Sequence, residues 1–198
     1  NSWKISIMPI ETLVPDLTTT PNPAWTGGLP HLQLDASDSN LLGCSTTGQS
    51  FIVSFGNLTS TIGSINSIVF GVQGLVEILR GVDAVCSFTI LDSSDSVLYT
   101  AETKGFNDTT FLTAQEGTTR TTSDGSTAWT ESDVNGLRMQ VKFNSITPGG
   151  GSFKLNFLKI DVDYVEFVDP NAGPYNNSAN SIHIASGNIS IVSGNIFI

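Results

Sequence analysis

The sequence predicts an all-β protein: a single antiparallel β-sandwich, jelly-roll-like, with an extended N-terminal arm and a C-terminal tail that carries a repeat. Between Leu29 and Phe167, short apolar runs alternate with clusters of Gly, Asn, Asp and Ser, as in sandwiches and barrels. Prolines at positions 9, 15, 21 and 23 favour extended or turn backbone before that region. We therefore expect an arm at 1–28, a sandwich at 29–168, and a linker with an Ile-x-Ile heptad-repeat tail at 169–198.

Size and charge restrict the function classes. With 198 residues, of which 39% are hydrophobic, the chain can form one sizeable core with extensions. Its 18 acidic and 8 basic residues give a net charge of −10, which argues against nucleic-acid and anionic-membrane partners. No run approaches the ~20 apolar residues that a membrane-spanning helix needs, and we expect no secretory signal.

The arm contains one short alternation of apolar residues. Trp3, Ile5 and Ile7 predict a strand that adds to a sheet edge, either the chain's own or a neighbour's. We expect Trp3 and Trp25 to be docked, because exposed tryptophans on a free arm are unfavourable.

The sandwich region predicts about eight strands. They lie at 29–34, 50–58, 65–76, 84–91, 97–100, 109–114, 137–145 and 152–167. In the last strand the apolar parity changes between Leu158 and Ile160, which predicts a β-bulge near Lys159. Thr130 followed by Asp133 has the spacing of a helix N-cap, so a short helical turn is expected there.

The tail repeats the unit Ile-x-Ile-(Ala/Val)-Ser-Gly-Asn at 182–188 and 189–195, and again, truncated, at 196–198. Each Ile-x-Ile triplet puts two branched side chains on one face of a strand, and a lone hairpin is marginal in water. The isoleucines of the tail must therefore be buried against the chain's own sandwich or, as we favour, against another chain. The candidate assembly-interface residues are Trp3, Ile5, Ile7, Ile182, Ile184, Ile189, Ile191, Ile196 and Ile198.

Catalytic motifs are missing from the sequence. His31 and His183 are the only imidazoles, and no Gly-x-Ser-x-Gly elbow accompanies them. Asp161 and Asp163 share one face of the last predicted strand, where solvation or pairing with Lys and Arg is the usual role of carboxylates. We expect no enzyme, no catalytic residues and no cofactor.

Two oxygen-rich clusters and two cysteines have ordinary structural interpretations. Turn chemistry is favoured over a structural ion for the cluster at 35–40 and for Asp92 with Asp95, so no metal site is expected. Cys44 and Cys86 match no zinc or redox spacing, and buried free thiols are favoured over a disulfide.

Scattered aromatic residues leave a glycan-binding class open. The candidate platform residues are Trp3, Trp25, Tyr99, Trp129 and Tyr175. For Trp129, beside the expected helical turn, a core or edge-covering role is favoured. A glycan partner therefore stays possible but unsupported.

Several segments together resemble β-sandwich structural proteins of tailed bacteriophages and prophages. The segments are Phe55-Gly56 with 62–72, the stretch 129–141 from Trp129 to Val141, the stretch 160–165, and the stretch 34–38. The resemblance spans about residues 30–168 and covers neither the arm nor the tail. It implies a virion component and brings no catalytic residues.

We therefore expect a non-enzymatic virion protein at the capsid surface or the tail. A capsid cement or decoration protein is favoured, forming a homo-oligomer (dimer or trimer) and contacting other virion proteins such as the major capsid protein. A tail-fibre or appendage subunit and a carbohydrate-binding host-recognition module remain alternatives.

Overall fold

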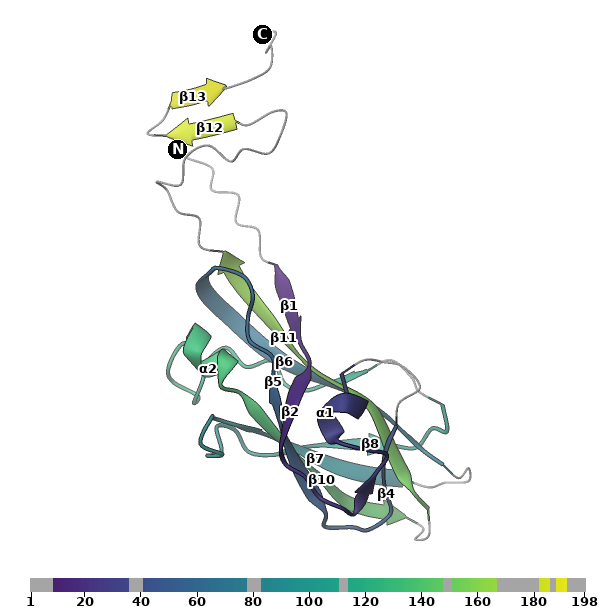
Figure 1. Ribbon diagram of the computed structural model, residues 1–198. Coiled ribbons are helices and arrows are strands. Elements are labelled where there is room, and N and C mark those ends of the chain that lie inside the picture. The colour runs from purple at the N-terminus through teal and green to yellow at the C-terminus, as the bar shows by residue number, and fades with distance from the viewer. Residues whose placement is uncertain are drawn as a thin grey trace.

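The computed structural model describes residues 9–35, 41–77, 83–110, 114–147, 151–166, 182–185 and 188–191. Within them, two antiparallel sheets of six and five strands pack as a sandwich, which confirms the predicted fold class (Figure 1). The first sheet has the order β3 (Trp25–Thr26), β4 (Leu42–Cys44), β11 (Phe153–Glu166), β6 (Ile62–Val76) and β9 (Gln115–Glu116), and β1 (Ile10–Leu13) also pairs with β11. The second has the order β2 (Pro15–Thr20), β5 (Ser50–Phe55), β10 (Arg138–Thr147), β7 (Asp83–Leu91) and β8 (Glu102–Phe106).

The strand order interleaves early and late parts of the chain. In the first sheet β4 lies beside β11, and in the second β5 lies beside β10. Successive strands from β4 to β7 alternate between the two sheets, so the chain crosses the core at each connection.

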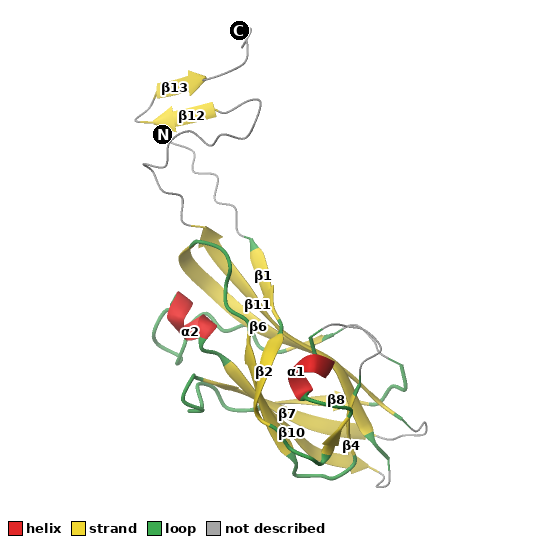
Figure 2. Cartoon of the chain, viewed as in Figure 1, coloured by secondary structure: helices red, strands yellow, loops and turns green. Residues whose placement is uncertain are grey.

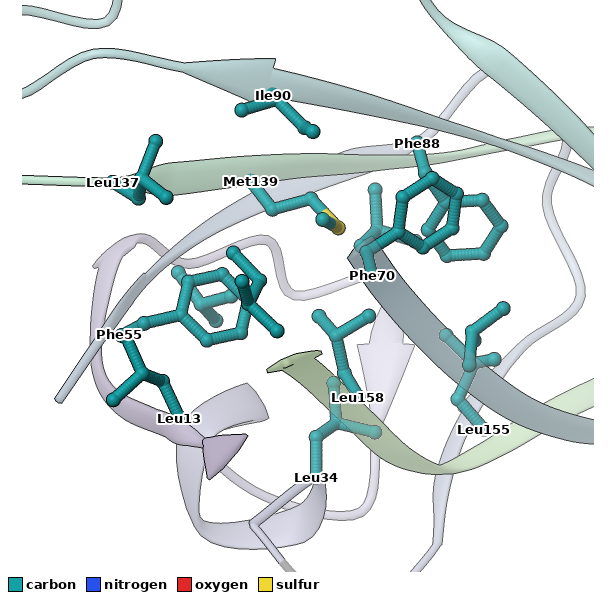
Figure 3. Packing of buried hydrophobic residues seen from close by; sticks show 14 of the residues in the cluster. Leu13, Leu34, Phe55, Phe70, Phe88, Ile90, Leu137, Met139, Leu155 and Leu158 are labelled. Atoms are coloured by element: carbon teal, nitrogen blue, oxygen red, sulfur yellow. The ribbon is translucent and has the colours of Figure 1, made fainter. Parts of the chain in front are cut away.

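Aromatic side chains join the two sheets across the core. Phe70 of β6 stacks on Phe88 of β7 with ring centroids 5.5 Å apart, and Phe143 of β10 stacks on Phe153 of β11 at 5.7 Å. Figure 3 shows Phe70 and Phe88 side by side, with Met139 pointing toward them. All five side chains are essentially inaccessible to solvent, so they supply much of the hydrophobic stabilisation of the sandwich.

The predicted strand at 29–34 is wrong. Residues Pro30–Gln33 form a short helix, α1, which Pro30 favours because its fixed φ suits the first helical turn. Leu34 is fully buried, whereas Leu29 and Leu32 are 48% and 52% exposed. Of the three leucines in 29–34, only Leu34 is part of the hydrophobic core.

Two further strand predictions fail or shift. Val97 makes only an isolated bridge to Leu91, and 97–100 forms no strand. Strand β9 lies just after the predicted 109–114, of which 111–113 fall outside the described residues. Strands β4 and β8 were not predicted.

The β-bulge in β11 lies earlier than predicted. The register against β6 shifts between Leu155 and Phe157, so the inward parity changes at Asn156 rather than near Lys159. Leu155 and Leu158 are fully buried and Phe157 is partly exposed. The bulge therefore turns outward a phenylalanine that simple alternation places inside.

The expected helical turn is helix α2 (Glu131–Asn135), one of the two helices drawn red in Figure 2. Its predicted N-cap is confirmed. Thr130 Oγ1 accepts a hydrogen bond from Asp133 N at 3.1 Å, and Asp133 Oδ2 accepts one from Thr130 N at 2.9 Å. The helix buries Val134 and leads directly into β10. Neither described helix is long and apolar enough to cross a membrane.

The described part of the predicted arm pairs with the chain's own sheets. Strand β1 runs along β11 in the first sheet and β2 runs along β5 in the second, so the N-terminal segment crosses from one sheet to the other. Trp25 is 4% exposed and meets the ring of Phe51 edge-on at 4.8 Å, so its predicted docking is confirmed.

The tail contributes two strands outside the large sheets. Strands β12 (Ile182–Ala185) and β13 (Asn188–Ile191) form an antiparallel two-stranded sheet of their own. The register pairs Ile182 with Ile191 and Ile184 with Ile189. Successive Ile-x-Ile triplets are therefore strands that pair with each other.

Candidate functional site

The two ends of the sandwich chain lie side by side at one end of the molecule. Ile10 of β1 pairs with Asp163 of β11, and Tyr164 N donates a hydrogen bond to Pro9 O at 3.3 Å. Figure 1 shows β1, β6 and β11 reaching this end together. We call this end, formed by residues 9–12, 59–66 and 162–166, the terminal pole.

A carboxylate fixes β1 at the terminal pole. Glu11 Oε1 accepts hydrogen bonds from the backbone N and the Oγ1 of Thr59, both at 2.8 Å. Partial burial raises the pKa of Glu11, but hydrogen bonds from Thr59 and Ser60 outweigh it, so the pKa is lowered. The ionised side chain thus holds the 59–60 loop against β1.

Asp161 and Asp163, considered above as paired carboxylates, are engaged in contacts within the sheet. Asp161 accepts a hydrogen bond from Thr12 Oγ1 at 2.6 Å and forms an ion pair with Lys159. Asp163 accepts a hydrogen bond from Asn66 Nδ2 at 3.3 Å. The ion pair to Lys159 agrees with the structural role that the sequence favours.

Helix α1 covers one open side of the sandwich. Thr18 N donates to His31 Nδ1 and His31 N donates to Thr18 Oγ1, each at 3.1 Å. Leu158 N donates to Leu34 O at 3.1 Å, which ties the end of α1 to β11. His31 therefore joins two segments of the fold.

Exposed leucines lie close to this contact. Leu17 of β2 is 54% exposed, and Leu29 and Leu32 are about half exposed beside and within α1, which packs on β2. The structure thus leaves three leucines of β2 and the α1 segment about half exposed.

A charged cluster closes the opposite side of the sandwich. Glu102 of β8 accepts hydrogen bonds from Thr118 N at 2.9 Å and Arg120 Nη2 at 2.7 Å. Lys104 Nζ donates to Glu116 O at 2.5 Å, which connects β8 of one sheet to β9 of the other. Burial raises the pKa of Glu102, but the contacts with Thr118 and Arg120 prevail and lower it.

The described tryptophans serve packing. Trp129 is 4% exposed and donates its Nε1 hydrogen to Arg120 O at 3.0 Å, which confirms the core role favoured for it. The guanidinium of Arg120 lies 4.4 Å from the ring centre of Tyr99. Trp25 and Trp129 are both buried, so neither described tryptophan offers an exposed platform for a sugar. Trp3 and Tyr175 lie outside the described residues.

Both cysteines are buried free thiols, as predicted. Burial raises the pKa of the Cys44 and Cys86 thiols, which lowers their reactivity. Asp92 Oδ1 accepts from Ser94 N and Ser96 N at 2.8 and 2.9 Å, which is the expected turn chemistry. Residues 36–40 of the other oxygen cluster lie outside the described residues.

A small open pocket of about 230 Å³ lies where β6 and β9 meet the end of β8. It is lined by Val72, Gln73, Gly74, Phe106, Asn107, Asp108 and Gln115. Its lining holds one carboxylate and no imidazole, thiol or hydroxyl. Across the described segments, no group of three or more His, Cys, Asp or Glu side chains is placed to hold a metal ion.

The predicted interface residues fall into two groups. Trp3, Ile5, Ile7, Ile196 and Ile198 lie outside the described residues, and Ile182, Ile184, Ile189 and Ile191 lie in β12 and β13. The sequence did not indicate the role of Glu11, nor that the start of β1 and the end of β11 lie side by side. The pairing between β1 and β11 joins residues about 150 positions apart.

The sequence matches no protein-family model, and no curated protein matches it significantly.

Proposed function

We propose that the protein is a non-enzymatic structural subunit of a bacteriophage virion. Its sandwich docks on the particle and its terminal segments lock it to neighbouring subunits. A capsid cement or decoration role is the favoured placement. The observation that carries this proposal is the emergence of both terminal segments, 1–8 and 167–198, from one end of a sandwich that closes its own sides.

The sandwich has little need of a partner for its own folding. The crossing from β1 to β2 and helix α1 cover one side, and the contacts of Glu102 and Lys104 cover the other. The two edge strands of the second sheet are thus contacted by other parts of the chain, β2 by α1 and β8 by β9, and exposed strand edges are what invites association. Assembly is left to the terminal segments.

Two tethers at one end favour durable attachment. Once one segment binds a neighbour, the other binds at a high effective concentration, so weak strand additions combine into a long-lived contact. The paired Ile-x-Ile strands β12 and β13 are suited to this role, because a two-stranded sheet alone is marginal in water.

The phage assignment rests on the sequence resemblance of residues 30–168 to virion sandwich proteins. The net charge of −10 suits a particle surface, since like charge keeps finished particles apart. The partners are then further copies of the chain, as a dimer or trimer, and other virion proteins such as the major capsid protein.

Deletion of residues 171–198 tests the proposal. The truncated protein should keep its circular dichroism spectrum and melting temperature, because the described sandwich ends at Glu166. It should lose binding to particles and oligomerisation, measured by co-sedimentation and light scattering. Undiminished binding by a folded truncated protein would contradict the role given to the tail.

A second variant tests whether binding requires the apolar side chains of the tail or only its length. Replacing Ile182, Ile184, Ile189 and Ile191 by Ser keeps the full tail but removes its apolar side chains. Loss of binding in this variant supports apolar contacts, whereas retained binding assigns the attachment to other tail residues.

A tail-fibre or appendage subunit is the second candidate placement, favoured by the repeat that continues to the chain end. Immunogold labelling of purified particles separates the two. Label over the capsid supports the cement role, and label confined to the tail supports the appendage.

A further inference from the structure

We infer that the sandwich stands on its assembly by the terminal pole, against a basic surface of a different protein, with the opposite end facing away. This inference rests on the proposed function and adds a direction and a partner chemistry to it.

The two ends of the sandwich are far apart. Strand β11 begins at Phe153, beside Cys44 of β4 and Val76 of β6, and ends at Glu166 opposite Ile62. A strand of 14 residues spans about 45 Å at ~3.3 Å per residue. We call the far end, formed by residues 44–48, 76–77 and 151–153, the distal pole, and it lies opposite the terminal pole in Figure 1.

The chain outside the sandwich is attached at the terminal pole. Residues 1–8 precede Pro9 and residues 167–198 follow Glu166, and the backbones of Pro9 and Tyr164 are hydrogen-bonded. An extended chain spans at most about 3.6 Å per residue, so a surface that binds residues 1–8 lies within about 29 Å of this pole, less than the length of β11. Tethers at opposite ends would instead lay the sandwich flat or make it a bridge.

Charge decides between a second copy and a different partner. The terminal pole carries Glu11, Asp163 and Glu166 and, among its described residues, no Lys or Arg. Pole-to-pole contact with another copy would bring like charges together. A surface rich in Lys and Arg complements it, and the resulting attraction weakens as salt rises.

Ile10 provides an apolar contact point at the same pole. Its side chain is 67% exposed and lies across the ladder from Asp163. An exposed isoleucine amid carboxylates suits a protein interface, in which apolar contacts are surrounded by charged ones.

Introduced cysteines test the orientation. Ser64→Cys places a thiol at the terminal pole and Thr47→Cys places one near the distal pole, both at exposed positions. The native thiols of Cys44 and Cys86 are 2% and 0% exposed and give little background. Both variants should react with a maleimide at similar rates in the free protein.

On particles carrying the protein, the Ser64→Cys thiol should react about tenfold more slowly, because a protein interface buries its site. The Thr47→Cys thiol should react at its free rate. Protection of the Thr47→Cys variant, or equal rates in both, would overturn the orientation while leaving the virion role intact. Failure of the wild-type protein to bind particles would instead overturn the proposed function.

A charge variant tests the partner. Asp163→Asn with Glu166→Gln should weaken particle binding several-fold at low salt, and the difference should shrink at high salt. Asp83→Asn, exposed at the start of β7, is the matched control and should bind like wild type. Equal binding by the double variant, or association of the free protein pole to pole, would overturn the basic-partner assignment.

Discussion

Gly117 shows how one missing side chain positions the segment beside β6. A Cβ at this residue would lie 2.1 Å from Cε1 of Phe70, and Gly117 N donates to Phe70 O at 2.8 Å. Phe70 is itself stacked on Phe88 and 1% exposed, so the ring has no room to retreat. The close approach of residues 115–120 to the first sheet therefore depends on glycine at this position.

We predict that Gly117→Ala lowers the free energy of unfolding by about 1–3 kcal/mol through overpacking against Phe70. Gly105→Ala in the neighbouring β8 is the control, because nothing lies within 4 Å of the added Cβ. Urea denaturation of both variants checks the prediction. An equal effect of the two substitutions would refute the packing argument.

Glu102 makes the cluster on the other side of the sandwich sensitive to acid. Its folded-state pKa is lowered from the ordinary 4.5, so its stabilising contribution is present above that value and is lost as the pH falls through the folded pKa. Protonation removes the charge that Thr118 N and Arg120 bind.

We expect Glu102→Gln to cost about 1.5–3 kcal/mol at pH 7, the range for hydrogen bonds to charged groups. The loss should shrink as the pH falls below the ordinary 4.5 and through the lowered folded-state pKa of Glu102, where the wild-type carboxylate is also protonated. Thermal unfolding across this pH range measures both effects. Glu116→Gln, whose side chain is exposed, should follow the wild-type curve, and a pH-independent loss in Glu102→Gln would contradict the charge argument.

At the scale of elements, helix α2 is short enough to depend on its cap. It has five residues, and the reciprocal hydrogen bonds of Thr130 and Asp133 satisfy backbone groups that the helix cannot satisfy internally. Leu58 N also donates to Asn135 Oδ1 at 2.7 Å, so the helix fixes the segment after β5.

We predict that Thr130→Ala lowers the free energy of unfolding by about 1 kcal/mol through loss of the N-cap. Ser132→Ala, exposed within the same helix, should change stability by less than about 0.5 kcal/mol. Chemical denaturation distinguishes the two variants. Indifference to Thr130→Ala would show that packing of Val134 alone holds the helix.

Elements that depend on local sequence patterns were predicted better than elements that depend on pairing with distant strands. The alternation around Phe70 and Met139 and the capping residues of α2 are local patterns, and the predicted β6, β10 and α2 are confirmed. Strand β8 carries Glu102 and Lys104 on an edge and lacks apolar alternation, so its existence depends on pairing with β7. The sequence therefore could not indicate it.

The bulge and α1 illustrate two other limits. The extra residue at Asn156 is specified by the opposing strand β6, which the sequence of β11 alone does not contain. The run from Leu29 to Leu34 is apolar enough for a strand, but Pro30 and the contact of His31 with Thr18 favour a helical turn. Composition predicts burial there, whereas tertiary contacts decide the backbone.

At the scale of the whole molecule, the sandwich architecture follows from the sequence, while the candidate interface follows only in part. The Ile-x-Ile periodicity predicts the strands β12 and β13. The start of β1 and the end of β11 lie close together because these strands pair, and no local sequence pattern reveals that pairing. Surface charge at the terminal pole likewise becomes visible only after folding.

The placement of both chain ends on one pole has a mechanical consequence. Strands β1 and β11 are antiparallel neighbours whose free ends point the same way. If both ends are anchored, drag on the body pulls along the strands and shears β11 against β4 and β6, loading many ladder bonds at once. A force that separates the two chain ends perpendicular to the strands would instead break the hydrogen bonds of the ladder one at a time. The fold should therefore withstand a larger force along the strands than across them.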